Sequence, residues 1–195
     1  MADIVGVVFA VTTAAVAVLG ATVVWSIAVP DRRIWPPPSR RSWQFALTWA
    51  LTGVGSAGLL VLAVLDARPL SDASALRIAA GAVLAVGGAA FALWGVRTLS
   101  LHAALGLGGP LVTGGPYRLS RNPQYVGDIA LLLGVALLSA SPRVWVAAGI
   151  GALWFALAPF AEEPWLRERL GSAYEEYLRT TARFLGPPAS AHASR

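Results

Sequence analysis

The longest uninterrupted apolar stretch, residues 4 to 29, limits what this chain can fold into more than any other feature. It carries no charged side chain over 26 consecutive residues, and about 20 apolar residues in a helix cross the hydrocarbon core of a bilayer. Four further apolar stretches follow, at about residues 43–65, 76–99, 123–140 and 144–161. A chain that is 56% hydrophobic and 13% charged is too apolar for a water-soluble domain. The sequence therefore predicts an all-α integral membrane protein with about five transmembrane helices.

The competing interpretation of the first stretch is a cleaved signal peptide. Its apolar core is too long for one, and Asp3 stands where a signal peptide carries basic residues. We therefore expect a three-span scaffold over residues 1–99, and a second part over residues 100–195 with a polar connector, a hairpin and a tail. The third span is rich in small residues, which let helices approach closely in lipid, namely Gly81, Gly87, Gly88, Ala89 and Ala90.

The last two apolar stretches are short and are joined by a tight turn at residues 141–143, so they predict a helical hairpin. Pro159 and Pro164 are expected to kink or unwind its second helix, which should end near residue 161. Beyond it we expect an amphipathic tail helix, divided by Gly171. The apolar side chains that recur there at helical spacing are Leu166, Leu170, Ala173, Tyr174, Tyr177 and Leu178.

Residues 111–125 form the one long polar, turn-rich segment between apolar spans. Its Gly-Gly-Pro run at residues 114–116 allows a tight turn and leaves backbone amides open, and Asn122-Pro123 predicts a second turn before a helix. Tyr117 and Tyr125 flank Arg118 and Arg121 in the same segment. This combination predicts a cradle for a small polar ligand.

Four short motifs occur in order along the second half of the chain. They are Leu-Val-Thr-Gly-Gly-Pro-Tyr at 111–117, Arg-Asn-Pro-Gln-Tyr-Val-Gly at 121–127, Glu162-Glu163, and Gly-Ser-Ala-Tyr-Glu-Glu-Tyr at 171–177. Over roughly residues 100–185 the chain resembles the membrane methyltransferase family typified by isoprenylcysteine carboxyl methyltransferase and the phospholipid N-methyltransferases. The first 99 residues share only their hydrophobic character with that family.

The resemblance implies S-adenosylmethionine as the cofactor, with Glu162 binding the donor's ammonium group. It implies a donor pocket formed by His102, Gly109, Pro110, Leu111, Val112, Tyr117, Asn122, Pro123, Gln124, Tyr125, Glu162 and Glu163. Asn122 replaces the family's usual histidine and cannot titrate near neutral pH, so we do not expect it to act as a general base. No catalytic side chain is identified.

Each of these residues also has a plainer interpretation. The two glutamates would simply mark the membrane interface and open the tail helix, and the tyrosines would anchor the chain at that interface. His102 would be a surface loop residue. Asp128 reads as a charge at the start of a helix, where the helix dipole favours it.

Several functional classes are excluded or disfavoured by composition. The chain has no cysteine and two histidines, so we expect no metal site. Its net charge of +5 comes from arginines beside the spans, where anionic lipid headgroups are closer partners than nucleic acid. We therefore predict membrane lipids as partners, without nucleic acid or a protein partner.

Arginines in the loops predict the orientation in the cell membrane. Four lie in the loop after the first span, three in the connector and five in the tail, against three on the opposite side. The positive-inside rule then places the N-terminus outside, and the cofactor site and C-terminus in the cytoplasm.

The sequence thus predicts an integral membrane methyltransferase that acts on a lipophilic, isoprenoid or lipid-like acceptor entering from the bilayer. The alternatives are a membrane reductase that resembles the sterol reductases and uses NADPH, or a catalytically silent scaffold. In prenylcysteine-methylating members of the family an arginine four residues before the donor-binding glutamate engages the acceptor's carboxylate. Ala158 stands there in this chain, and no arginine lies between residues 144 and 161. A free prenylcysteine carboxylate is therefore not expected as the acceptor.

Overall fold

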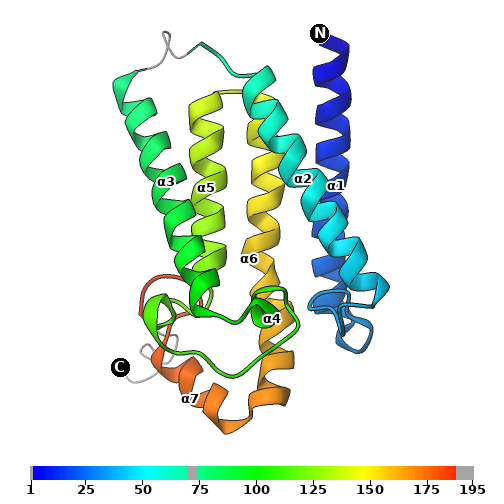
Figure 1. The fold of residues 1–195 in the computed structure, drawn as a ribbon, viewed down its shortest axis with the longest axis vertical. Helices are drawn as coiled ribbons and strands as arrows, with labels where there is room; N and C mark the ends of the chain where they lie inside the picture. The colour runs from blue at the N-terminus through cyan, green and yellow to red at the C-terminus, as the bar shows by residue number, and fades with distance from the viewer. Residues whose placement is uncertain (1, 70–73, 188–195) are drawn as a thin grey trace.

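The computed structural model describes residues 2–69 and 74–187, and this part of the chain contains helices and loops but no strand (Figure 1). The five long helices are α1 (Ala2–Ala28), α2 (Trp43–Leu65), α3 (Ala75–Thr98), α5 (Pro123–Ser139) and α6 (Pro142–Leu170). Shorter helices are α4 (Leu101–Ala104) and α7 (Ser172–Thr180), with 3₁₀ turns at Pro30–Arg32 and Gly115–Arg118.

Four of the long helices, α1, α2, α3 and α6, are long and apolar enough to cross a membrane. Helix α5 is apolar but has 17 residues, which is the lower end of the range for a spanning helix. The expected all-α, multi-pass membrane fold is confirmed. Helix α2 has the predicted bounds, α1 and α3 differ from them by one or two residues at each end, and α5 begins as predicted and ends one residue early.

Helices α3 and α5 approach each other closely through glycine. A Cβ atom added to Gly127 would lie 2.4 Å from the backbone nitrogen of Ala92, and one added to Gly88 would lie 2.5 Å from that of Leu131. These contacts leave no room for a side chain and fix α5 against α3. Gly87, which the sequence suggested for such a contact, has open space beside it.

The prediction that the last span ends near residue 161 is wrong. Helix α6 continues without interruption through Pro159 and Pro164 to Leu170, and it ends at Gly171, whose φ is +58°. Each internal proline removes a backbone hydrogen bond, and α6 accommodates this loss at Pro159, which is buried, and at Pro164, which is exposed. The helix therefore continues past the expected end and holds Glu162 and Glu163 in its C-terminal part.

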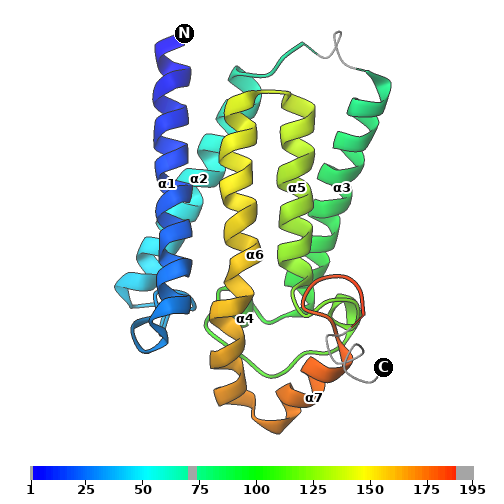
Figure 2. The same cartoon turned by 180° about the vertical axis from the view of Figure 1, so that it is seen from behind.

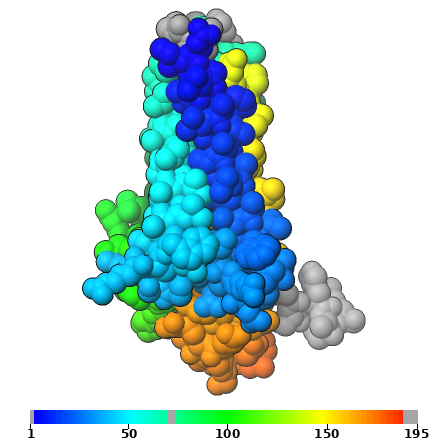
Figure 3. Space-filling view, turned by 90° about the vertical axis from the view of Figure 1, so that its right-hand side faces the viewer, coloured from blue at the N-terminus to red at the C-terminus, as the bar shows by residue number. Residues whose placement is uncertain are grey.

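The longer loops gather at one end of the bundle, which we call the polar end (Figure 2). It contains residues 29–42 between α1 and α2, the connector 99–122, and the tail over residues 171–187. Figure 3 shows α1 and α2 side by side on one face, with the loop 29–42 at their base and the end of α6 beneath it. At the opposite end Arg143 pairs with Asp66 at 2.8 Å across the two loops.

Candidate active site

The first cavity lies at the polar end, between the connector, the C-terminal half of α6 and α7. All but two of the residues predicted for the donor pocket line it, and their role in binding a donor stays a prediction. They are Gly109, Pro110, Leu111, Val112, Tyr117, Asn122, Gln124, Tyr125, Glu162 and Glu163.

His102 and Pro123 do not line this cavity. His102 is exposed, and its Nδ1 donates to the carbonyl oxygen of Gly108 at 2.9 Å, which shapes the loop from outside. Pro123 is buried at the first turn of α5, where its missing N–H costs nothing.

The Glu162 carboxylate meets two side chains from distant parts of the chain. The indole Nε1 of Trp35 donates to Oε1 at 2.5 Å, and the hydroxyl of Tyr125 donates to the same atom. Trp35 is 3% exposed and also contacts Trp154 edge-on, with ring centroids 5.3 Å apart. One carboxylate oxygen is therefore fixed by two donors.

Trp35 was missed as a site residue. Nothing in the sequence singled it out, because tryptophans beside spans commonly lie in the headgroup layer as interfacial anchors. Trp43, in the same loop region, does have an exposed side chain, whereas Trp35 turns inward to α6. The two positions carry no distinguishing sequence signal, because the partner of Trp35 lies 127 residues away.

A glycine-rich segment forms another wall of the cavity. Gly106 and Gly108 have φ values of +77° and +81°, and a Cβ on Gly106 would lie 2.6 Å from the ring of Trp35. In the described part of the chain, the amides of Gly108, Gly109, Leu111 and Val112 donate to no backbone carbonyl. This wall therefore carries backbone N–H groups that no backbone carbonyl occupies.

Aromatic side chains cover the remaining sides. The Trp165 ring lies under the guanidinium of Arg169, 5.0 Å from the ring centroid, and Tyr117, Tyr174 and Tyr177 form one buried cluster. The Tyr177 hydroxyl donates to the Tyr117 carbonyl oxygen at 2.7 Å. Burial raises the pKa of both phenols, so they stay protonated at neutral pH. The predicted amphipathic tail helix thus packs against the connector, although Ala173 is exposed.

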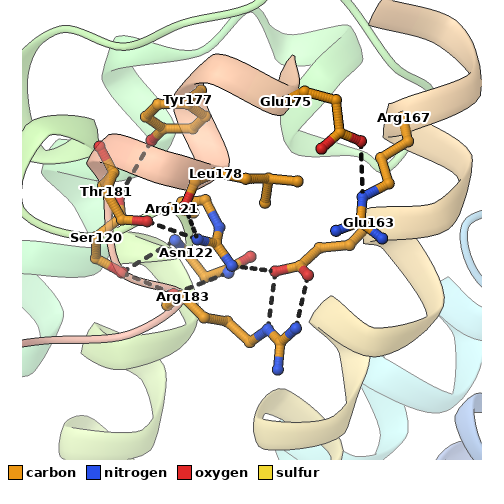
Figure 4. A network of polar contacts seen from close by, with 10 residues as sticks. All are labelled: Ser120, Arg121, Asn122, Glu163, Arg167, Glu175, Tyr177, Leu178, Thr181 and Arg183. Carbon is orange, nitrogen blue, oxygen red and sulfur yellow. Dashed lines mark hydrogen bonds and ion pairs between the residues drawn. The ribbon is translucent and has the colours of Figure 1, made fainter. Parts of the chain in front are cut away.

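Glu163 has different surroundings, shown in Figure 4. Its carboxylate pairs with Nη2 of Arg121 at 2.8 Å, and it accepts two bonds from Arg183 at 2.8 and 2.7 Å. The Glu163 and Arg121 side chains are only 6% and 7% exposed. The charge of Glu163 is thus matched by arginines of the chain itself.

The same arginine joins the connector to the tail. Nη1 of Arg121 donates to the carbonyl oxygens of Leu178 and Thr181 at 3.3 and 2.5 Å, and the side-chain amide of Asn122 donates to that of Arg183 at 3.0 Å (Figure 4). The side-chain amide of Asn122 is therefore hydrogen-bonded to the backbone of the tail. We call Arg121, Asn122, Glu163 and Arg183 the latch.

The second cavity lies between α1, α2, α5 and α6, within the membrane-spanning bundle. Its volume is about 240 Å³, and its lining is mainly apolar. It shares four lining residues with the first cavity, namely Trp35, Ala104, Gln124 and Tyr125. The two cavities therefore meet beside the two side chains that hold Glu162.

Asp128 lines the second cavity. The sequence suggested only a charge at a helix start, but the residue lies in the second turn of α5 and faces the bundle interior. Three further polar atoms of the lining are buried without a hydrogen-bond partner, Oγ1 of Thr48 and Nε1 of Trp49 and Trp154. No cluster of three or more potential metal ligands occurs among the described residues.

Comparison with known proteins supports one family. The model of the phospholipid methyltransferase family matches residues 76–173, from α3 to the start of α7. This range includes the glycine contacts of α3 with α5, the connector, and both glutamates. Searches of curated proteins and of solved structures gave no match. The chain belongs to the phospholipid methyltransferase family and is a multi-pass membrane methyltransferase.

Proposed function

We propose that the protein transfers a methyl group from S-adenosylmethionine to a lipophilic acceptor, with the donor in the first cavity and the acceptor in the second. The observation that carries this proposal is the position of Glu162. Its carboxylate lines the first cavity and is held by Trp35 and Tyr125, which line both. A carboxylate at the end of a membrane span is costly unless it has a function or a partner.

The residues of the first cavity fit the groups of the donor. Glu162 supplies a carboxylate for the ammonium group, and the backbone amides of Gly108, Gly109, Leu111 and Val112 supply donors for the carboxylate or ribose. Trp165 and the tyrosine cluster supply flat apolar surfaces for the adenine. The latch closes the cavity on its tail side, and we assign Glu163 to this structural task.

Bound S-adenosylmethionine supplies an activated methyl group on a sulfonium sulfur. The protein's own task is then to align the acceptor with that group and to keep water out. The junction at Trp35, Gln124 and Tyr125 gives an acceptor in the second cavity a path to the first. A sulfonium placed there would meet aromatic faces, which favour cations.

Equilibrium binding tests this function against its rivals. We expect purified full-length protein in detergent to bind S-adenosylmethionine by calorimetry and to show no heat with NADPH. Binding of NADPH alone would favour the reductase, and binding of neither would favour a scaffold.

We also propose that the N-terminus lies outside and the polar end in the cytoplasm, because the loops of that end carry most of the arginines. The chain has no cysteine, so single cysteines report cleanly. In intact cells an impermeant thiol reagent should label Ala67→Cys and spare Ser172→Cys, both at exposed positions. The reverse pattern would invert the orientation.

A further inference from the structure

We propose that Asp128 binds the acceptor in the second cavity and takes its proton, and that this acceptor is a lipid with an uncharged hydroxyl group. The inference rests on the function proposed above and names its acceptor class. It starts from a carboxylate inside a membrane bundle, which is expensive and therefore indicates a function.

Asp128 is the only acidic residue that lines the second cavity in the described part of the chain. It lies one helical turn after Gln124 on α5. Gln124 lines both cavities, so Asp128 lies close to the junction. Among the described residues neither arginine nor histidine lines this cavity, so Asp128 meets no cation of that part of the chain there.

The unpartnered atoms of the cavity indicate what it binds. Trp154 and Thr48 are 8% and 1% exposed, and the indole nitrogen of one and the hydroxyl of the other lack a partner. The indole nitrogen of Trp49 lacks one too. An indole N–H only donates, so it requires an acceptor oxygen on the ligand. A buried donor without such an oxygen costs about 1 to 3 kcal/mol.

Among common lipid head groups, a hydroxyl satisfies both requirements. It donates its proton to the Asp128 carboxylate and accepts from an indole N–H with its oxygen. An ammonium group donates to Asp128 but leaves the indoles unpaired. A carboxylate or phosphate accepts from the indoles but meets the charge of Asp128 without any cation to offset it.

The reaction then balances with residues and reactants already named. The hydroxyl oxygen of the acceptor forms a bond to the methyl carbon, while the carbon–sulfur bond breaks and its electron pair stays on sulfur. The hydroxyl proton passes to the Asp128 carboxylate. The products are a lipid methyl ether, the uncharged thioether and a protonated Asp128.

Photolabelling tests the acceptor class without requiring turnover. Three probes of one chain length carry a diazirine in the chain and end in a hydroxyl, a primary ammonium or a carboxylate. With full-length protein in detergent, we expect the hydroxyl probe to label peptides around residues 147–155 about tenfold more than either charged probe. Equal or stronger labelling by a charged probe would overturn the inference.

Substitutions test whether Asp128 is responsible for the preference for the hydroxyl probe. Asp128→Asn should reduce the hydroxyl preference by about tenfold and leave S-adenosylmethionine binding unchanged, whereas Asp31→Asn, an exposed aspartate in the loop after α1, should change neither. If Asp128→Asn does not fold, Trp154→Phe tests the same site, because it removes an unpaired indole donor. This variant should reduce labelling by the hydroxyl probe several-fold. An unchanged preference in the folded variants would refute the assignment.

The chemistry of the product gives an independent readout. With radiolabelled donor and a membrane lipid extract, we expect labelled lipid whose methyl group resists alkali, as an ether does. Release of labelled methanol would indicate a methyl ester and would overturn the inference, as would the absence of any labelled lipid. Failure of the wild-type protein to bind S-adenosylmethionine would instead refute the proposed function itself.

Discussion

The two regions around Glu162 and Glu163 are neighbours in the sequence but are built in opposite ways. Glu162 accepts from two uncharged donors, Trp35 and Tyr125, and lines a cavity. Glu163 is enclosed by two arginines, one from the connector and one from the tail. Among the described residues no cation pairs with the first carboxylate, whereas two arginines pair with the second.

This difference shows how adjacent carboxylates take different tasks. Successive residues on a helix point about 100° apart, so α6 directs one side chain to the cavity junction and the other to the latch. A negative charge without a cation is ready for a positive ligand, whereas a buried charge with two cations serves to hold segments together. The predictions below separate the two regions.

The largest effect on stability is expected in the latch. Glu163→Gln leaves Arg121 and Arg183 without their carboxylate, and removing one partner of a buried ion pair costs about 3 to 5 kcal/mol. Thermal unfolding in detergent should show this loss. The matched control is Glu175→Gln on α7, whose pair with Arg167 is half exposed (Figure 4) and is worth about 0 to 1 kcal/mol. Similar losses in both variants would contradict a buried latch.

A smaller loss of stability is expected from substitution of Gly127, where α5 packs against α3 close to the Glu162 region. Gly127→Ala places a Cβ against the backbone of α3, and overpacking of this kind costs about 1 to 3 kcal/mol. Because Tyr125 lies two residues away on α5, affinity for S-adenosylmethionine should fall as well. Gly87→Ala is the control, since its Cβ meets open space and alanine favours helix by about 1 kcal/mol. A stable Gly127→Ala protein with full affinity would refute the close packing.

The smallest effect is expected on donor affinity, from substitution of Tyr125 at the cavity junction. Tyr125→Phe removes one of the two donors to Glu162, and an ordinary hydrogen bond contributes about 0.5 to 1.5 kcal/mol. We expect affinity for the donor to change by less than about tenfold, without the stability loss of Glu163→Gln. Calorimetry on the folded variant measures it. A complete loss of binding would mean that Tyr125 itself, rather than Glu162, contacts the donor.

Much of the fold could be predicted because apolar length and turn residues are local signals. Helix α2 begins and ends where its pattern indicated, and Gly171 divides the tail as its conformational freedom suggested. The end of α6 could not be predicted, because proline rules describe an isolated helix, whereas α6 continues through a buried Pro159 and an exposed Pro164. The seven-residue spacing of Gly81 and Gly88 was a clearer signal of helix contact than composition, which also pointed to Gly87.

The candidate site was predictable only along one segment. Motifs placed Gly109 to Tyr125 and the two glutamates together, and the structure lines one cavity with most of them. Trp35 and the difference between Glu162 and Glu163 depend on contacts between residues far apart in sequence. Contacts of that kind leave no signal in the spacing or composition of the sequence. Asp128 was likewise interpreted as a helix-start charge, because its neighbours across the bundle could not be known from the sequence.

The most direct test of the central claim is the affinity of Glu162→Gln for S-adenosylmethionine, measured by calorimetry beside the wild-type protein. The substitution keeps the shape of the side chain and removes the charge that we assign to the donor's ammonium group. Loss of a charge-assisted hydrogen bond should cost about 1.5 to 3 kcal/mol, or roughly ten- to a hundredfold in affinity, while thermal stability stays near that of the wild type. Unchanged affinity in a folded Glu162→Gln protein would contradict the account.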